Sequence, residues 1–133
     1  VASFRTLLEK ILEWRAKYST DRQRVDFCTP HLKEPAHWMI NILPDSFQEY
    51  VKSDIEFMKA NLNKGLAGFN EVEVERLERV LTVMQTYKLS DNEQKDAMRD
   101  FAAFFTEHDK RRRTDFYSTF PEYISFMEEC KKI

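Results

Sequence analysis

The sequence predicts a mainly α-helical protein. Apolar residues recur at three- and four-residue spacings through most of the chain, which is the period of one face of a helix. At four places where such a stripe begins, a capping residue stands three positions before glutamate or glutamine. Only two glycines interrupt the chain. These observations predict a compact bundle of about five helices, with one or two short strands in the N-terminal third.

Two helices are predicted in the first half of the chain. Residues 3–18 place apolar side chains on one helical face, and Ser3 is the expected N-cap. The second helix starts at Asp45, which has the capping-box spacing with Gln48, and Gly65 is its expected stop. The apolar stripe of each segment predicts burial against a core.

Three further helices are predicted in the second half. The first ends near residue 87, the second is long and rich in phenylalanine, and the third closes the chain. Their capping spacings are Asn70 to Glu73, Ser90 to Glu93 and Thr119 to Glu122. In the last helix, Pro121 stands in the first turn, where its missing N–H costs nothing. The side chains expected to face inward there are Tyr123, Ile124, Met127 and Cys130.

The N-terminal third also contains two extended patterns. In residues 24–29, Val25 and Phe27 alternate with polar or small neighbours, and Pro30 ends the run. A short strand is therefore predicted there. Residues 37–43 place three bulky apolar side chains at period two, which favours a second extended piece. A buried helical turn is the alternative for that second segment.

Length and composition limit the classes of protein to which the chain can belong. A chain of 133 residues suits one domain, so residues 1–133 are predicted to form a single helical domain. No apolar run approaches the roughly 20 residues that span a bilayer. Glu9, Lys10 and Glu13 stand where a signal peptide needs apolar residues. Two cysteines do not make a disulfide framework, and we therefore expect a cytoplasmic protein without membrane contact.

The sequence lacks the usual patterns of a stand-alone enzyme. Two glycines cannot build a phosphate-binding loop, and no serine has the flanking glycines of a nucleophile elbow. We therefore predict no catalytic residue, no cofactor and no bound metal. The one metal hypothesis is the spacing of Cys28, His31 and His37, which offers three zinc ligands but no fourth. Histidines that bond backbone at a strand end are the favoured alternative.

A run of basic residues follows the fourth predicted helix. Cations at a helix C-terminus stabilise the helix dipole by about 0.3–1 kcal/mol each, without any ligand. Arg111, Arg112 and Arg113 also support an alternative function, nucleic-acid binding, together with Arg22 and Arg24. The net charge of −2 and the acidic residues beside the run argue against a basic field of the kind that nucleic acids need.

Large aromatic side chains mark the surfaces expected to contact a partner protein. Trp14, Trp38 and Tyr50 are the candidates, because aromatic residues dominate binding energy at protein interfaces, and core placement is the alternative for each. Six phenylalanines at helical spacing are interpreted as core packing rather than as a base-stacking platform. They are Phe101, Phe104, Phe105, Phe116, Phe120 and Phe126. The oligomeric state is left open.

Two longer stretches read RVDFCTPHLKEPAHWMINILP and FFTEHDKRRRTDFYSTFPEYISFM. They resemble the C-terminal portion of radical S-adenosylmethionine proteins of the twitch-domain group. The matching positions are Val25, Pro30, Leu32, Pro35, Asp109, Arg112, Phe116, Phe120, Pro121 and Glu122. The resemblance implies a late barrel strand that leads into helices, and a closing helix pair. In that pair, Asp109 and Arg112 are spaced to bond across one helical turn.

The chain lacks the cysteine motif with which proteins of this group bind their iron–sulfur cluster. Such enzymes hold a [4Fe–4S] cluster with three cysteines at C-x3-C-x2-C, and the only cysteines here are Cys28 and Cys130. The resemblance therefore implies the tail of such an enzyme, or a descendant that kept only the helical end. We expect a non-catalytic helical domain that binds another protein or serves as an accessory domain. A small nucleic-acid-binding protein is the alternative.

Overall fold

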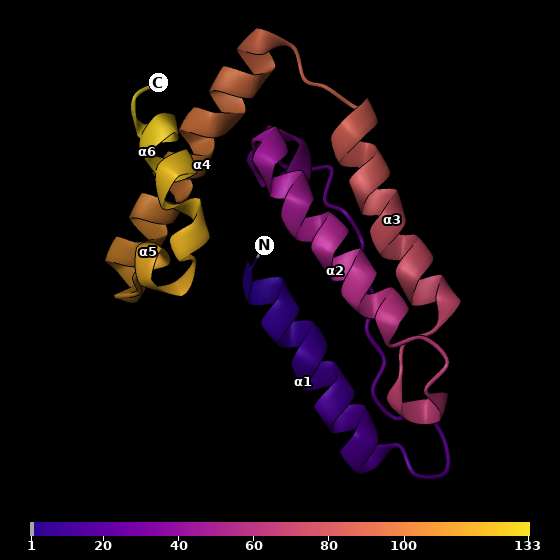
Figure 1. Cartoon of the computed structure of the whole chain (residues 1–133). Helices are drawn as coiled ribbons and strands as arrows, with labels where there is room; N and C mark the ends of the chain where they lie inside the picture. Colours follow the sequence, from indigo (N-terminus) through magenta and orange to yellow (C-terminus); the bar gives the residue numbers. More distant parts are fainter. Residues whose placement is uncertain (1) are drawn as a thin grey trace. The chain divides into compact units, whose positions relative to one another are not determined.

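The computed structural model describes residues 2–133, and it is mainly α-helical, as predicted (Figure 1). The α-helices are α1 Ala2–Tyr18, α2 Gln48–Ala60, α3 Glu71–Thr86, α4 Asp91–Arg112, α5 Phe116–Thr119 and α6 Ile124–Lys131. Short 3-10 turns join them: η1 Ala36–Trp38, η2 Ile40–Ile42, η3 Asp45–Phe47, η4 Gly65–Ala67 and η5 Pro121–Tyr123. None of the helices in the described part is both long enough and apolar enough to cross a membrane.

The chain divides into two compact units by its internal contacts. Unit 1 consists of Val1–Pro30 and Asp45–Gln85, and unit 2 consists of His31–Pro44 and Thr86–Ile133. Each unit therefore combines two stretches that are separated in the sequence. The single domain over residues 1–133 stays a prediction.

Unit 1 is built from α1, α2 and α3, with α1 and α2 running in the same direction and α3 in the opposite one (Figure 1). An ion pair between Lys59 and Glu78, with 2.9 Å between Nζ and Oε1, joins α2 to α3. The buried apolar side chains are Leu8, Ile11, Phe47, Val51, Ile55, Met58, Phe69, Val74, Leu77, Val80 and Met84. The predicted stripes of the second and third helices therefore face a core, whereas in α1 Leu8 and Ile11 do so and Leu7 and Tyr18 are exposed.

Asp54 is a buried carboxylate inside unit 1. Its Oδ1 accepts a hydrogen bond from Arg5 Nε at 2.9 Å, while Oδ2 has no hydrogen-bond partner among residues 2–133. Burial raises the pKa of Asp54 above its usual value, because the loss of hydration outweighs the attraction of the Arg5 guanidinium. Ionisation of Asp54 is therefore less favourable in the folded protein than in the unfolded chain.

We expect stability to depend on pH through this group. A carboxyl whose pKa is raised on folding contributes stability that is lost as pH rises through the folded pKa. The asparagine of the Asp54→Asn variant does not titrate. The free energy of unfolding of this variant, minus that of the natural protein, should therefore increase from pH 3.8 to neutral pH. The lower limit is the ordinary pKa of Asp. Urea unfolding at several pH values measures this difference. The exposed Asp96→Asn variant is the control, and an equal pH dependence in both variants would contradict the prediction.

Unit 2 is built around α4, against which α6, η1 and η2 pack. Its core is aromatic: the Phe101 ring lies 5.2 Å from that of Phe126 and 5.9 Å from that of Phe116, between centroids. The other buried members are Ile42, Ala97, Ala102, Met127 and Cys130. The interpretation of the phenylalanines as packing holds for these three rings, whereas Phe104 remains 38% exposed.

Two of the predicted helix starts have both bonds of a capping box. Glu73 N donates to Asn70 Oδ1 at 2.9 Å, and Asn70 N donates to Glu73 Oε1 at 3.2 Å. Ser90 and Glu93 form the same reciprocal pair at the start of α4. These bonds satisfy N–H groups that a helix leaves unpaired in its first turn.

The other predicted boundaries differ from the structure. Ser3 lies inside α1 rather than at its cap. Gln48 does contact Asp45 at 3.2 Å, but a 3-10 turn comes first and α2 begins at Gln48 itself. The second helix ends at Ala60, five residues before the predicted stop at Gly65. Thr119 closes α5 instead of opening the last helix, because its hydroxyl donates back to Asp115 O at 2.8 Å.

The predicted strands do not form among residues 2–133, where the only β-bridge is an isolated one between Leu62 and Phe69. Residues 23–29 keep the predicted alternation in exposure, but no second strand lies alongside them. Residues 36–42 fold as the one-turn helices η1 and η2, so the extended interpretation was wrong there and the helical alternative was right. Ile42 reaches the core from that turn and is 1% exposed.

The end of α4 is organised by Asp109. Its Oδ2 accepts the backbone N–H of Phe116 at 2.9 Å, and its Oδ1 accepts the Thr114 hydroxyl at 2.8 Å. The bond from Phe116 holds the pKa of the Asp109 carboxyl below its usual range. The expected pairing of Asp109 with Arg112 was therefore wrong, because the carboxylate bonds the turn that follows the helix instead.

Candidate protein-binding site

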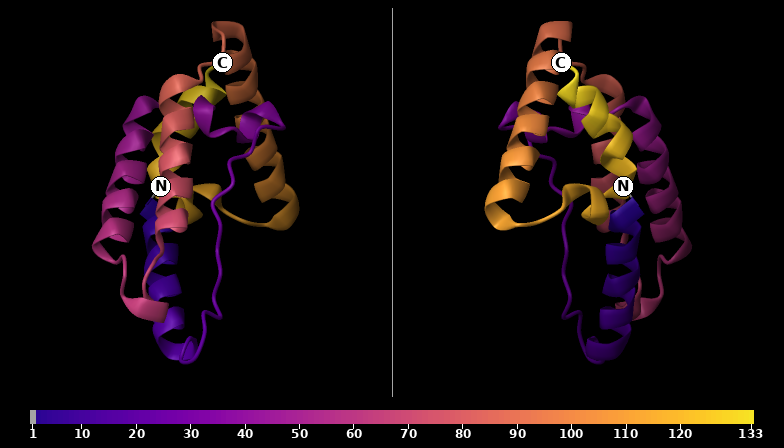
Figure 2. Two further views of the ribbon diagram at one scale, coloured as in Figure 1. Left: turned by 90° about the vertical axis from the view of Figure 1, so that its right-hand side faces the viewer. Right: turned by 90° about the vertical axis from the view of Figure 1, so that its left-hand side faces the viewer.

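Residues 23–30 of unit 1 form what we call the extended segment, which has neither helical turns nor bends. Figure 2 shows this part of the chain running almost straight after the end of α1. Exposure alternates along it: Val25 and Phe27 are half-buried, whereas Asp26 and Cys28 are exposed. The alternation is that of a β-strand with one covered face.

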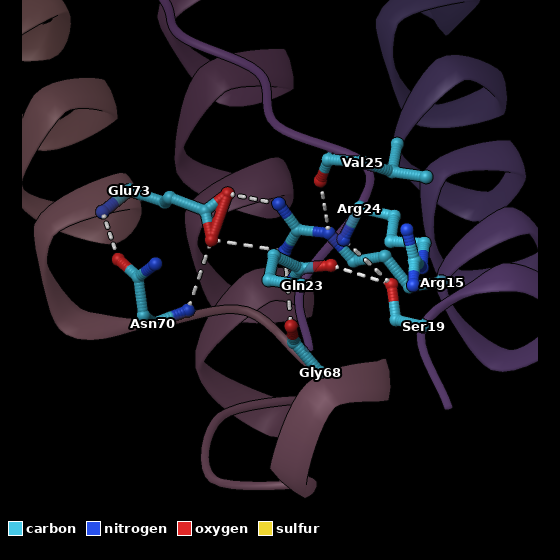
Figure 3. Close-up of polar contacts among 8 residues, drawn as sticks. All are labelled: Arg15, Ser19, Gln23, Arg24, Val25, Gly68, Asn70 and Glu73. Atoms are coloured by element: carbon cyan, nitrogen blue, oxygen red, sulfur yellow. Dashed lines mark hydrogen bonds and ion pairs between the residues drawn. The ribbon is translucent and has the colours of Figure 1, made fainter. Parts of the chain in front are cut away.

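A buried arginine fixes the extended segment to the helices. Arg15 of α1 is 1% exposed, and its Nε donates to Val25 O at 2.8 Å. Its Nη1 donates to Gly68 O at 2.9 Å, and its two terminal nitrogens bind both oxygens of Glu73 at 2.9 and 2.8 Å (Figure 3). The guanidinium also lies 5.7 Å from the ring centroid of Phe69. One side chain thus joins α1, α3, the loop before α3 and the extended segment.

Gly68 is required for this arrangement. A Cβ at position 68 would lie 2.6 Å from Asn61 O, which is far inside van der Waals contact. Only glycine lets the loop pass this close to the end of α2 and still present its carbonyl to Arg15.

A second contact holds the start of the extended segment. Ser19, which follows the last residue of α1, accepts the backbone N–H of Arg24 at 3.1 Å and donates its hydroxyl to Gln23 Oε1 at 2.8 Å (Figure 3). Both anchors of the segment are therefore side chains rather than a neighbouring strand.

The backbone of the extended segment makes no backbone hydrogen bond with any residue from 2 to 133. Among its carbonyls and N–H groups, Val25 O and Arg24 N bond the side chains described above. Unpaired N–H and C=O groups along an extended chain resemble the edge of a β-sheet, which can pair with another chain.

A hollow of about 1160 Å³ opens beside this edge. On one side it is lined by Asp26, Phe27 and Cys28 of the extended segment. On the other side it is lined by Asn63, Gly65, Phe69, Asn70, Glu71, Val72, Glu73 and Arg76. The Phe27 and Phe69 rings meet edge to face, with centroids 5.8 Å apart. Val72 is 52% exposed there.

The predicted contact residues are distributed over both units. Trp14 on α1 and Tyr50 on α2 belong to unit 1 and are 41% and 37% exposed. Trp38 belongs to unit 2 and is 43% exposed, with its ring edge on to Phe104 at a centroid distance of 5.4 Å. Each of these side chains has surface available for contact, and none of them lines the hollow.

Two of the three arginines in the cluster have a local structural role at the end of α4. Arg111 pairs with Glu107 at 2.6 Å between Nε and Oε1. Arg113 caps α4 in the left-handed conformation, with φ of 54°. Arg112 is the last helical residue and is exposed.

Cys28, His31 and His37 do not form a metal-binding group. No cluster of three or more His, Cys, Asp or Glu side chains suited to a metal ion occurs within residues 2–133. His37 instead lies in an aromatic group, with its ring centroid 5.6 Å from that of Phe104 and 5.6 Å from that of Trp38.

The buried pair of Arg15 and Glu73 was not predicted from the sequence. The signal was available in part, because Arg15 falls on the same helical face as Leu8 and Ile11, both of which are buried. A cation at a core position of an amphipathic helix requires a buried partner. The identity of that partner depends on how α1 and α3 pack.

Comparison with known proteins assigns the chain to no family. No family model, curated protein or solved structure matches it.

Proposed function

We propose that this chain is a non-catalytic helical domain that binds another protein, and that the hollow beside the extended segment is the binding site. The observation that carries the proposal is the unpaired backbone of residues 23–30 at the edge of an open hollow. Exposed backbone groups of an extended chain are a recognised docking feature for polypeptides.

The shape and lining of the hollow support this function. At about 1160 Å³ it exceeds the usual range of about 300–1,000 Å³ for small-molecule pockets. Its lining combines the apolar Phe27, Phe69 and Val72 with polar side chains. Protein interfaces likewise combine apolar and polar groups.

The buried pair beneath the hollow supports a preformed site. Arg15 and Glu73 hold the two walls at fixed separation through bonds of 2.8 and 2.9 Å. A site that is already ordered loses less conformational freedom on binding, and this saving increases affinity. Trp14 and Tyr50 remain candidates for additional contacts in the same unit.

Selection from a random twelve-residue peptide library tests the proposal. Cys28 is exposed and lines the hollow, whereas Cys130 is 1% exposed, and burial raises the pKa of its thiol to about 11. A bulky maleimide should therefore modify Cys28 alone. We expect selected peptides to bind the natural protein and to lose at least tenfold in affinity after this modification.

Two variants make the test specific. Cys28→Ser should bind the selected peptides normally, because it retains the backbone and removes only the thiol. In a Cys28→Ser background, a cysteine at exposed position 118 of unit 2 carries the same label away from the hollow, and binding should be unchanged. Recovery of no peptide, or equal binding before and after Cys28 modification, would show that the proposal is wrong.

The relationship to the C-terminal portion of twitch-domain radical S-adenosylmethionine proteins is likewise a proposal. It is supported by the sequence positions described above, including Pro30 and Pro35. We also propose a cytoplasmic location, which is supported by the cysteine content.

Nucleic-acid binding is the weaker function. Arg111 already pairs with Glu107 at 2.6 Å, and the chain has a net charge of −2. Binding to nucleic acid depends on several free cations acting on one phosphate backbone. We therefore favour a protein partner.

A further inference from the structure

We infer that the partner binds as an extended strand that adds to residues 23–30 of this chain by backbone hydrogen bonding. This inference rests on the proposed function, since it specifies how the hollow beside the extended segment would be filled. It commits to one occupant, an extended segment of another protein with apolar side chains at alternate positions.

The extended segment has unused capacity for backbone hydrogen bonding. From residue 20 to residue 34, the described chain contains no backbone-to-backbone hydrogen bond. Helices cannot satisfy these groups, because the N–H and C=O groups in the middle of a helix are paired internally. A polypeptide in extended conformation can satisfy them, and its own backbone is satisfied in return.

Backbone groups of alternate residues in an extended chain point to opposite edges. In an antiparallel pair, one residue directs both its N–H and its C=O to the same neighbour, and the next residue directs them to the opposite edge. Val25 O accepts the hydrogen bond from Arg15 Nε, so the edge to which Val25 and Phe27 direct their backbone groups faces α1. Asp26 and Cys28 therefore direct their backbone groups to the other edge.

The hollow lies where a strand paired with that edge would run. Asp26, Phe27 and Cys28 line the hollow, and Val72 on its far side is 52% exposed. A strand paired with Asp26 and Cys28 would have every second side chain directed to one face. Apolar side chains on that face would cover Phe27 and Val72, which explains the apolar preference.

The length of the pairing is limited by the chain itself. Pro30 has no N–H, so it cannot donate to a neighbouring strand. At the other end, Arg24 N is already bonded to Ser19 Oγ at 3.1 Å. The pairing is therefore short and centred on residues 26–28, and the affinity should depend on few hydrogen bonds.

Single N-methylation of the bound peptide tests the inference. Each backbone amide of the best selected peptide is methylated in turn, which removes one donor and adds steric bulk. We expect at least two positions, two residues apart, at which affinity falls tenfold or more, which corresponds to about 1.4 kcal/mol. Methylation of the amide between them should change affinity less than threefold.

Amide hydrogen exchange on the protein provides a second readout. Peptide binding should slow exchange at Asp26 and Cys28, which face the hollow edge, and should leave Phe27 unchanged. A helical peptide would protect neither amide, and its N-methylation profile would not repeat every two residues.

The outcomes separate this inference from the proposed function. Cys28 modification could abolish peptide binding while the methylation profile has no period of two and the amides of Asp26 and Cys28 stay unprotected. In that case the protein binds peptides at the hollow by another mode, and the inference is wrong. If Cys28 modification has no effect, the proposed function is wrong as well. If the peptide-free protein sediments as a dimer with Asp26 and Cys28 already protected, the occupant is a second copy, which overturns the assignment to another protein.

Discussion

Replacing Arg15 with alanine is expected to reduce the free energy of unfolding by about 3–5 kcal/mol. The side chain is 1% exposed, and the Glu73 carboxylate that it binds is 5% exposed. Removing the cation leaves a buried negative charge whose remaining bond is to the backbone N–H of Asn70 at 3.2 Å. The cost of an unpaired buried charge exceeds that of the lost contact itself.

The same substitution affects two backbone carbonyl groups. Val25 O and Gly68 O each lose a donor, at 2.8 and 2.9 Å respectively. Of its two hydrogen-bonded anchors, the extended segment then keeps the one at Ser19. We therefore expect faster amide exchange and proteolysis in residues 23–30, in addition to the loss of stability.

Urea unfolding of matched variants measures this effect. Arg24→Ala is the control, because Arg24 pairs with Asp21 at 3.0 Å on the surface, and exposed pairs contribute about 0–1 kcal/mol. A double variant, Arg15→Met with Glu73→Leu, replaces both charges by apolar side chains of similar size and should be more stable than Arg15→Ala. If Arg15→Ala costs no more than Arg24→Ala, the buried pair does not have the role assigned to it.

Phe101→Ala is expected to destabilise unit 2 by about 3–5 kcal/mol. Phe101 is 6% exposed and lies at the centre of the aromatic core. Its ring neighbours are Phe105, Phe116, Tyr123 and Phe126, at centroid distances of 4.8, 5.9, 6.2 and 5.2 Å. The substitution removes the transfer energy of the ring and leaves a cavity that rigid aromatic neighbours fill poorly.

The control is the same substitution one turn along α4. Phe104 is 38% exposed, so Phe104→Ala creates little cavity and should cost clearly less. Thermal unfolding, followed by near-ultraviolet circular dichroism, reports the aromatic packing directly. Equal losses at both positions would contradict the placement of the core on the Phe101 side of α4.

Local sequence patterns determined where most helices lie. The capping boxes of Asn70 with Glu73 and Ser90 with Glu93 involve residues three apart, so their bonds need no tertiary contact. The apolar period likewise identified the inward face of α4, where Ala97 and Phe101 are buried. The first turns of α2 and α6 were less predictable, because 3-10 turns precede both helices.

Tertiary structure alone decided the fate of residues 23–30 and of Arg15. Alternation of Val25 and Phe27 predicts an extended chain, but a strand also needs a neighbouring strand, and here the side chains of Arg15 and Ser19 bond the segment instead. A helical period likewise places Arg15 on the buried face, while only the packing of α1 against α3 brings Glu73 within 2.8 Å of it. Hydrogen bonds between distant segments depend on three-dimensional position, which the short-range spacing of residue types does not encode.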